Sequence, residues 1–168
     1  MSRESQMNNV GVFEMAERRE KRAAEQQDML ARCGLPLVCI NMNIAGPVKR
    51  GALIDWAFFR ALNAAANGFK GKIRGFAFTN EKTGIEARLA VDAAAESLKK
   101  QAESIEKEFP EGRLFDIDVI GTGGLKLSRN VPRKCLICGQ PAAACARSRT
   151  HSAEELRKAT AELLKKAA

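Results

Sequence analysis

Apolar and polar residues alternate with a period of two in four short stretches of the chain, and helical composition and spacing occupy the stretches between them. The alternation predicts strands at 37–44, 72–79, 85–91 and 114–120. Helices are predicted at 11–33, 52–67 and 93–109. Gly34 and Pro36 end the first helix, and 80–84 reads as a turn. From residue 37 to 120 the order is therefore β-α-β-β-α-β, the ferredoxin-like split unit.

The length and the element order predict one α+β domain over all 168 residues. We expect its parts to be a loose tail (1–10), an N-terminal helix (11–34), a ferredoxin-like βαββαβ core with two covering helices (35–120), and a Cys- and Arg-rich segment ending in a helix (121–168). Ser152 is the predicted N-cap of that last helix, which runs to about Lys166.

Alternation also assigns the two faces of the sheet. One face takes the apolar sets Val38, Ile40, Met42, Ile44 of the first strand, Ile85, Ala87, Leu89, Val91 of the third and Phe115, Ile117, Val119 of the fourth. The opposite face carries Asn41, Asn43, Glu86, Arg88, Asp116 and Asp118. Because the first and fourth strands are neighbours in this topology, their Asn and Asp side chains should converge as the floor of a functional site. The alternative is that the terminal helix or a loop docks on this face.

The charge of the chain indicates the kind of partner to expect. The net charge is +8 and the isoelectric point is near 9.5, which favours an anionic partner such as nucleic acid, a polyphosphate ligand or an acidic protein. No Asp or Glu occurs from residue 119 to 153, whereas six cations do: Lys126, Arg129, Arg133, Lys134, Arg147 and Arg149. An ordinary solvated basic surface is the competing interpretation. A single Trp and no Tyr give little support to base stacking on single-stranded nucleic acid.

The same composition bears on location and on the thiols. No apolar run approaches the roughly 20 residues of a membrane span, and the start of the chain lacks an apolar signal core. We therefore expect a cytoplasmic protein without a membrane partner. In a reducing compartment, five cysteines with Cys135 and Cys138 only three apart favour a metal or reactive thiols over disulfides.

One Cys₃His set stands out near the C-terminus. Cys135, Cys138, Cys145 and His151 are soft ligands of the kind that zinc prefers in tetrahedral sites. Two alternatives remain open: unmetallated thiols packed in a small lobe, or His151 as a general base. A histidine bound to a metal cannot also act as that base.

Three further groups suit phosphate chemistry. Asp116 and Asp118 lie two apart on one strand, roughly 7 Å along it, and such a pair can hold Mg²⁺ against substrate phosphates, although a solvated strand face is the simpler interpretation. Arg147 and Arg149 precede the capped last helix, and arginine forks match phosphate oxygens. The loop 46–51 offers Lys49 and Arg50 between glycines before a helix, without P-loop spacing.

Several blocks of the chain resemble one known family, the apo-citrate lyase phosphoribosyl-dephospho-CoA transferases. They are Gly34–Val38, Gly46–Lys49, Leu89–Asp92, Gly112–Ile120, Leu127–Arg129 and Cys135–Leu156, and they span most of the chain from about Leu30 onward. The run Cys-Ala-Arg-Ser-Arg-x-His-Ser-x-x-Glu-Leu from Cys145 to Leu156 is the most distinctive of them.

The resemblance implies a reaction and its partners. A serine hydroxyl of the apo acyl carrier subunit of citrate lyase attacks the α-phosphate of the donor, 2′-(5″-triphosphoribosyl)-3′-dephospho-CoA, and pyrophosphate leaves. We expect no nucleic-acid partner. From their chemistry, we expect Arg113, Arg129, Arg147, Arg149, Asn41 and Asn43 to bind the donor. Lys49, Asp116, Asp118 and His151 form the expected catalytic set, with Mg²⁺ on the two aspartates and zinc as a candidate on Cys135, Cys138, Cys145 and His151.

Three other functions fit some of these features. A small zinc-knuckle nucleic-acid binder would share the charge and the Cys₃His set, and its affinity would fall steeply with salt. A non-catalytic assembly factor would bind the carrier without modifying it. The same chemistry could also serve a different acyl carrier protein, such as that of malonate decarboxylase.

Overall fold

The computed structural model describes residues 9–168, which are built around one four-stranded sheet. The strands are β1 (Leu37–Met42), β2 (Ile73–Glu81), β3 (Gly84–Val91) and β4 (Phe115–Ile120), in the spatial order β2-β3-β1-β4. Every neighbouring pair is antiparallel. The predicted α+β class and the predicted neighbourhood of the first and fourth strands are therefore confirmed.

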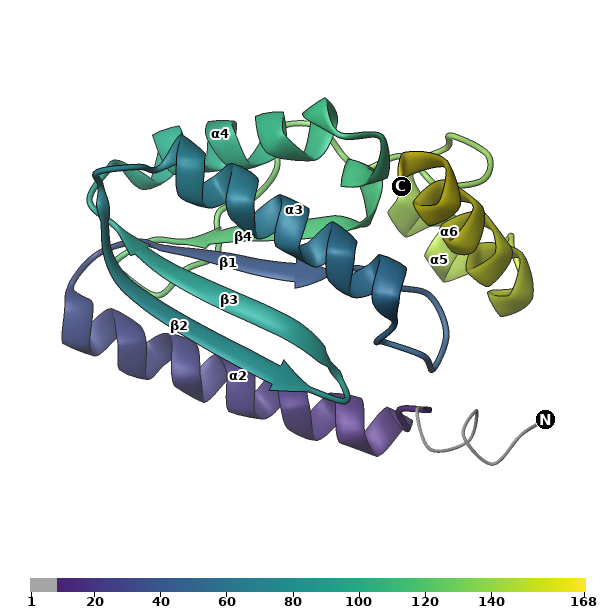
Figure 1. Cartoon of the computed structure of the whole chain (residues 1–168), viewed down its shortest axis with the longest axis horizontal. Coiled ribbons are helices and arrows are strands. Elements are labelled where there is room, and N and C mark those ends of the chain that lie inside the picture. The colour runs from purple at the N-terminus through teal and green to yellow at the C-terminus, as the bar shows by residue number, and fades with distance from the viewer. Residues whose placement is uncertain (1–8) are drawn as a thin grey trace.

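Helices cover both faces of the sheet (Figure 1). Helices α3 (Ala52–Gly68) and α4 (Ala95–Glu108) lie on one face, and α2 (Val12–Cys33) lies on the other. The face assignment from alternation is confirmed: Val38, Ile40, Leu89 and Ile117 are almost fully buried in the core that α3 and α4 cover. The predicted strand periodicity thus fixed which side of each strand is apolar.

Helix α2 docks on the opposite face, where the alternative interpretation had expected the terminal helix or a loop. Its Met29 and Leu30 pack against Leu37, Cys39 and Ala90. The polar side chains of β3 on this face bind the helix and form no open floor, because Glu86 and Arg88 are only 3% and 6% exposed. Of the two, only Glu86 also reaches the lining of a cavity. The prediction of an open polar floor is therefore corrected for β3. When a helix covers charged side chains, it must supply charges of the opposite sign, because an unpaired buried charge is costly.

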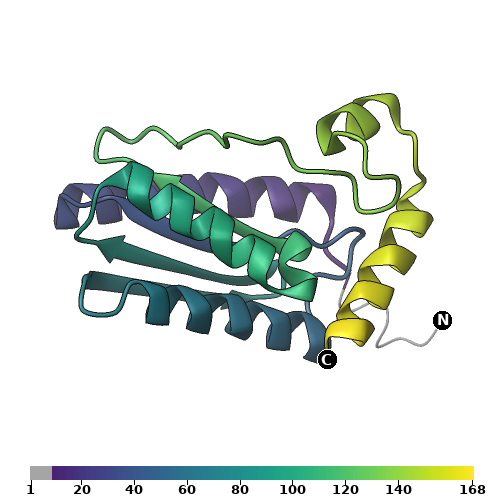
Figure 2. The ribbon, with the colours of Figure 1, turned by 90° about the horizontal axis from the view of Figure 1, so that it is seen from above.

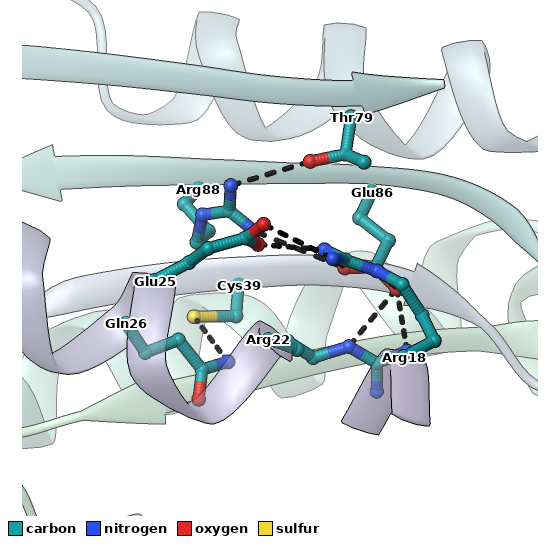
Figure 3. A network of polar contacts seen from close by, with 8 residues as sticks. All are labelled: Arg18, Arg22, Glu25, Gln26, Cys39, Thr79, Glu86 and Arg88. Atoms are coloured by element: carbon teal, nitrogen blue, oxygen red, sulfur yellow. Dashed lines mark hydrogen bonds and ion pairs between the residues drawn. The ribbon is translucent and has the colours of Figure 1, made fainter. Parts of the chain in front are cut away.

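The matching charges form a network between α2 and β3 (Figure 3). Arg18, itself 2% exposed, donates to Glu86 at 3.1 and 2.6 Å and to Glu25 at 3.0 and 2.6 Å. Arg22 donates to the same Oε1 of Glu86 at 3.0 and 2.5 Å. The Nη1 of Arg88 lies 2.7 Å from Glu25. Each buried charge in this network therefore faces an opposite one.

After β4 the chain returns along α4 and the β4 edge as an extended strap, residues 121–134 (Figure 2). The strap is tied to β4 by the Leu127 N–H, which donates to the Val119 carbonyl at 2.8 Å. Glu106 of α4 accepts from the Ile117 N–H at 2.9 Å and pairs with Arg129 and with Arg133, the latter at 2.7 Å. Two of the predicted cations therefore hold the strap in place.

A 3₁₀ turn, η1 (Pro110–Leu114), leads into β4. The C-terminal segment adds two helices at one end of the sheet, α5 (Ala142–Ser148) and α6 (Ala153–Ala167). The predicted cap of the last helix is confirmed, because Ser152 Oγ accepts from the Glu155 N–H at 3.1 Å and Glu155 Oε2 accepts from the Ser152 N–H at 2.7 Å. The elements η1 and α5 were not predicted.

The last two residues of the predicted tail make backbone contacts with the loop before α3. Residues 1–8 of the predicted tail lie outside the described residues, but Asn9 pairs with Val48, and the Val10 N–H donates to the Pro47 carbonyl at 2.9 Å. Within residues 9–168, no helix combines the length and the apolarity that crossing a membrane requires.

One glycine beside the strap makes a tight contact. A Cβ added at Gly112 would lie 2.2 Å from the backbone oxygen of Glu106. We expect Gly112→Ala to lower the free energy of unfolding by about 1–3 kcal/mol, because the backbone of η1 must move away from α4. Urea denaturation measures this. Gly123→Ala is the control, since that glycine has open space around it, and an equal loss in both variants would contradict the prediction.

Candidate active site

A polar cavity of about 220 Å³ opens where the end of β1 meets α2 and the β2–β3 turn. Its lining includes the charged and amide side chains of Arg19, Arg22, Asn41, Asn43, Lys49 and Asp116. Four of these were predicted. Arg19 and Arg22 were not, although with Met15 they recur at helical spacing on one side of α2.

Lys49 reaches this cavity from the loop between β1 and α3. Its Nζ donates to the Ile44 carbonyl at 2.6 Å, which holds the side chain against the end of β1. Burial, and then the nearby positive charge of Arg19, lower the pKa of the Lys49 ammonium below its ordinary value. The neighbouring Arg50 is used structurally, because it forms a two-pronged ion pair with Asp55 at 2.8 Å for both bonds.

A larger and mainly apolar cavity of about 640 Å³ lies between the end of β1, η1 and the C-terminal segment. Ala45, Leu114, Leu136 and Leu156 contribute to its walls. Arg113, Arg149 and His151 also line it. An apolar cleft with a few convergent polar groups is the usual form of a small-molecule site.

The two cavities adjoin at Asn43, which lines both. Its backbone N–H donates to the Leu114 carbonyl at 2.7 Å, so the end of β1 is fixed against η1. Asn43 thus lies where the cavity at the acid-bearing end of the sheet borders the cavity of the cationic C-terminal segment, and the two cavities together are the candidate site. Asp116 lies on one side of Asn43 and Arg149 on the other.

The predicted arginines are divided between this site and other parts of the surface. Arg113 lines the apolar cavity and donates to the Lys134 carbonyl at 2.6 Å. Burial, followed by repulsion from Arg133, lowers the pKa of its guanidinium below the ordinary value. Arg129 lies outside both cavities and pairs with Glu106, and Arg147 is exposed on α5 outside both linings.

Arg149 occupies an unusual backbone position. Its φ is 49°, the only positive φ outside glycine among residues 9–168. Left-handed backbone costs a non-glycine residue about 1–2 kcal/mol, and such residues cluster at functional sites. Here it ends α5 and turns the chain toward His151 and α6.

The two predicted aspartates do not face one shared point. Asp116 lines the polar cavity and is 3.1 Å from Arg133 of the strap. Asp118 is 2.5 Å from Lys126 and 4.0 Å from the buried Lys99, and it does not belong to the lining of either cavity. The two carboxylates differ because the strap brings Arg133 beside Asp116 and Lys126 beside Asp118. Strand periodicity cannot predict the path of the strap.

The Cys₃His set does converge. The ligand atoms of Cys135, Cys138, Cys145 and His151 all lie within 4.8 Å of one another. In a tetrahedral zinc site, bond lengths near 2.3 Å place sulfur atoms about 3.8 Å apart, and the Sγ atoms of Cys138 and Cys145 are 3.4 Å apart. The described residues therefore contain a candidate metal cluster that fits zinc.

Local structure brings these four ligands together. Cys135 and Cys138 flank a tight turn, in which the Gly139 N–H donates to the Cys135 carbonyl at 3.3 Å and Gly139 has a φ of 70°. Helix α5 presents Cys145. Hydrogen bonding with His151, and then with the Gln140 backbone, lowers the pKa of the Cys138 thiol to about 6, whereas the hydrogen bond with Cys138 raises the pKa of the Cys145 thiol to about 11. Cys138 is therefore the first of these two thiols to ionise, and the thiolate is the form that binds a metal.

Comparison with known proteins identifies the family. The family profile of apo-citrate lyase phosphoribosyl-dephospho-CoA transferase matches residues 10–167. A probable apo-citrate lyase phosphoribosyl-dephospho-CoA transferase of Vibrio cholerae is 38% identical over 157 residues, which cover 88% of each chain. The Citrobacter koseri transferase of the same name is 37% identical over 154 residues, 88% of this chain and 84% of its own. The residues that the profile matches include the strands, the linings of both cavities and the Cys₃His cluster. The chain therefore belongs to the apo-citrate lyase phosphoribosyl-dephospho-CoA transferase family.

Proposed function

We propose that this protein attaches the phosphoribosyl-dephospho-CoA prosthetic group to a serine of the acyl carrier subunit of citrate lyase. The serine oxygen bonds to the α-phosphorus of 2′-(5″-triphosphoribosyl)-3′-dephospho-CoA. The bond from that phosphorus to the bridging oxygen breaks, and pyrophosphate leaves with the electron pair. The family match gives the reaction class and its partners.

The observation that carries the residue-level proposal is the junction of the two cavities at Asn43. The donor has less polar parts as well as several phosphates, so its site needs both an apolar cleft and cationic side chains. The apolar cavity, flanked by Arg113 and Arg149, is our candidate for the dephospho-CoA part. Such transfer depends mainly on positioning and on neutralising developing charge, which fixed cations supply.

Zinc is our proposed occupant of the Cys₃His cluster. The three cysteine sulfurs and the histidine nitrogen suit zinc, and so do the distances between them. Bound zinc would link the turn at Cys135, helix α5 and the start of α6. Arg149 lies between Cys145 and His151 in the sequence, so bound zinc would hold it beside the apolar cavity. With His151 as a zinc ligand, we assign the serine proton to Asp116.

Magnesium is the expected counter-ion of a triphosphate. Its shared site on Asp116 and Asp118 stays a prediction, and the separate ion pairs of these carboxylates do not favour it. We derive no step from such a site. We also propose the ferredoxin-like assignment for the sheet, which the element order and the antiparallel order β2-β3-β1-β4 support.

The proposed function is tested by the mass of the carrier. Purified protein is mixed with apo carrier, donor and Mg²⁺, and the intact carrier is expected to gain the mass of one phosphoribosyl-dephospho-CoA group. Asp116→Asn should lower the transfer rate by about 100-fold or more if the carboxylate accepts the proton. An unchanged carrier mass, with carrier and donor proven competent with a known transferase, would eliminate the proposal.

A further inference from the structure

We propose that the polar cavity is a pyrophosphate-binding subsite, and that the N-terminal helix α2 completes it with Arg19 and Arg22. The inference rests on the proposed function for its place in the reaction, where it would hold the outer two phosphates of the donor and then the leaving pyrophosphate. The binding itself can be tested without the reaction.

The first support is the charge balance of the cavity. Its lining brings in three cations, Arg19, Arg22 and Lys49, and three carboxylates, Asp55, Glu86 and Asp116. Each carboxylate has a cationic partner from outside the lining: Arg50, Arg18 and Arg133 respectively. The cavity and its immediate partners therefore carry an excess of positive charge.

The second support is that two cations of the lining have no carboxylate partner among the described residues. Among residues 9–168, neither Arg19 nor Lys49 forms an ion pair with an acidic side chain. Lys49 is half-buried, and its Nζ has one hydrogen bond, to the Ile44 carbonyl. Holding like charges together in a partly desolvated place costs free energy unless an anion binds between them.

The third support is that Arg22 is positioned by a buried acid (Figure 3). Glu86 accepts from the Nε and Nη2 of Arg22 at 3.0 and 2.5 Å, while Arg18 holds the other oxygen of Glu86 at 2.6 Å. Glu86 is only 3% exposed and Arg22 is 22% exposed at its side chain. A guanidinium fixed in this way needs little reorganisation when an anion arrives, which is how enzymes preorganise charge.

Size and position then select the anion. A volume of about 220 Å³ suits a small polyphosphate, whereas a whole nucleotide needs the larger adjoining cavity. Three cations match the charge of a diphosphate group better than that of a carboxylate. The junction at Asn43 lets one donor occupy both cavities, with its α-phosphate near the junction.

The test is calorimetric titration of the full chain with inorganic pyrophosphate in magnesium-containing buffer at fixed ionic strength. We expect Arg19→Gln with Lys49→Gln to weaken binding about tenfold to a hundredfold, because two charge-assisted contacts are lost. The matched control is Arg32→Gln with Lys100→Gln, which removes the same charge from exposed positions of α2 and α4. The control is expected to bind as the wild type does.

Three results would overturn the inference: wild-type protein that does not bind pyrophosphate, equal affinity in the cavity variant, or an equal loss in the control. The single variant Arg19→Gln separates lost binding from misfolding, because Arg19 is exposed and the fold should not depend on it. It is expected to show part of the loss in pyrophosphate affinity. If pyrophosphate binds as expected but the carrier mass never changes, the proposed function fails and the binding site stands. If the carrier is modified but the cavity variant binds normally, the inference alone fails.

Discussion

Cys138→Ser is expected to remove zinc from the protein and to abolish transfer to the carrier. Helix α5 has only seven residues and none of them is buried, so neither helix propensity nor packing can hold it in place. The metal would supply that stability, because structural zinc sites bind with apparent free energies of about 10–16 kcal/mol at neutral pH. Without the zinc, Arg149 would no longer be held beside the apolar cavity.

Elemental analysis and the carrier-mass assay measure the two effects. The wild type is expected to contain about one zinc per chain, and Cys138→Ser much less. Cys33→Ser is the matched control, since Cys33 lies outside the cluster on α2, and it should keep both metal and activity. Full activity in a metal-free wild-type preparation would reject the zinc proposal and return His151 to consideration as the base.

Glu86→Gln is expected to lower the free energy of unfolding by about 3–5 kcal/mol, the usual cost of removing one partner from a buried ion pair. The substitution leaves Arg18, which is 2% exposed, with Glu25 as its one remaining carboxylate among the described residues. It also releases Arg22 from its anchor. Urea denaturation followed by circular dichroism measures the loss. Glu20→Gln, an exposed position of α2, is the control and should change little.

The same residue makes stability depend on pH. Burial alone would raise the pKa of Glu86, but the hydrogen bonds from Arg18 and Arg22 outweigh it and hold the pKa below the ordinary value of 4.5. A carboxyl whose pKa is lower in the folded state stabilises the fold above its unfolded pKa and loses this effect as the pH falls through the folded value. Wild-type stability should therefore drop below about pH 4.5, and the drop should be shallower in Glu86→Gln. Parallel pH profiles of the two proteins would contradict this account.

Strand periodicity predicted much of the fold because it depends on local alternation. The apolar faces of β1, β3 and β4 follow from that pattern alone, whereas the neighbourhood of β1 and β4 was expected from the order of the elements. Helix α5 escaped prediction because its seven residues are too few to show a period, and because its place beside Cys135 and His151 depends on contacts distant in the sequence. The boundaries of β2 also moved, from a predicted 72–79 to Ile73–Glu81.

The candidate site was predictable in part. Lys49, Asn43, Asp116, Arg113, Arg149 and His151 were chosen by chemistry and do line the adjoining cavities. Asp118 and Arg129 were chosen on the same grounds but pair with Lys126 and Glu106, because the course of the strap is a long-range property. Arg19 and Arg22 were missed since helical spacing shows that residues share a side, not which surface that side meets.

The docking of α2 also sets an order of events during synthesis of the chain. The side chains that seat this helix lie far downstream: Arg18 and Glu86 are 68 residues apart in the sequence. An emerging α2 must therefore wait for β3 to leave the ribosome before its charges find their partners, and contacts of such long separation form slowly. Until then the arginines of the emerging α2 segment lack these carboxylate partners, so their charges are open to other anionic groups.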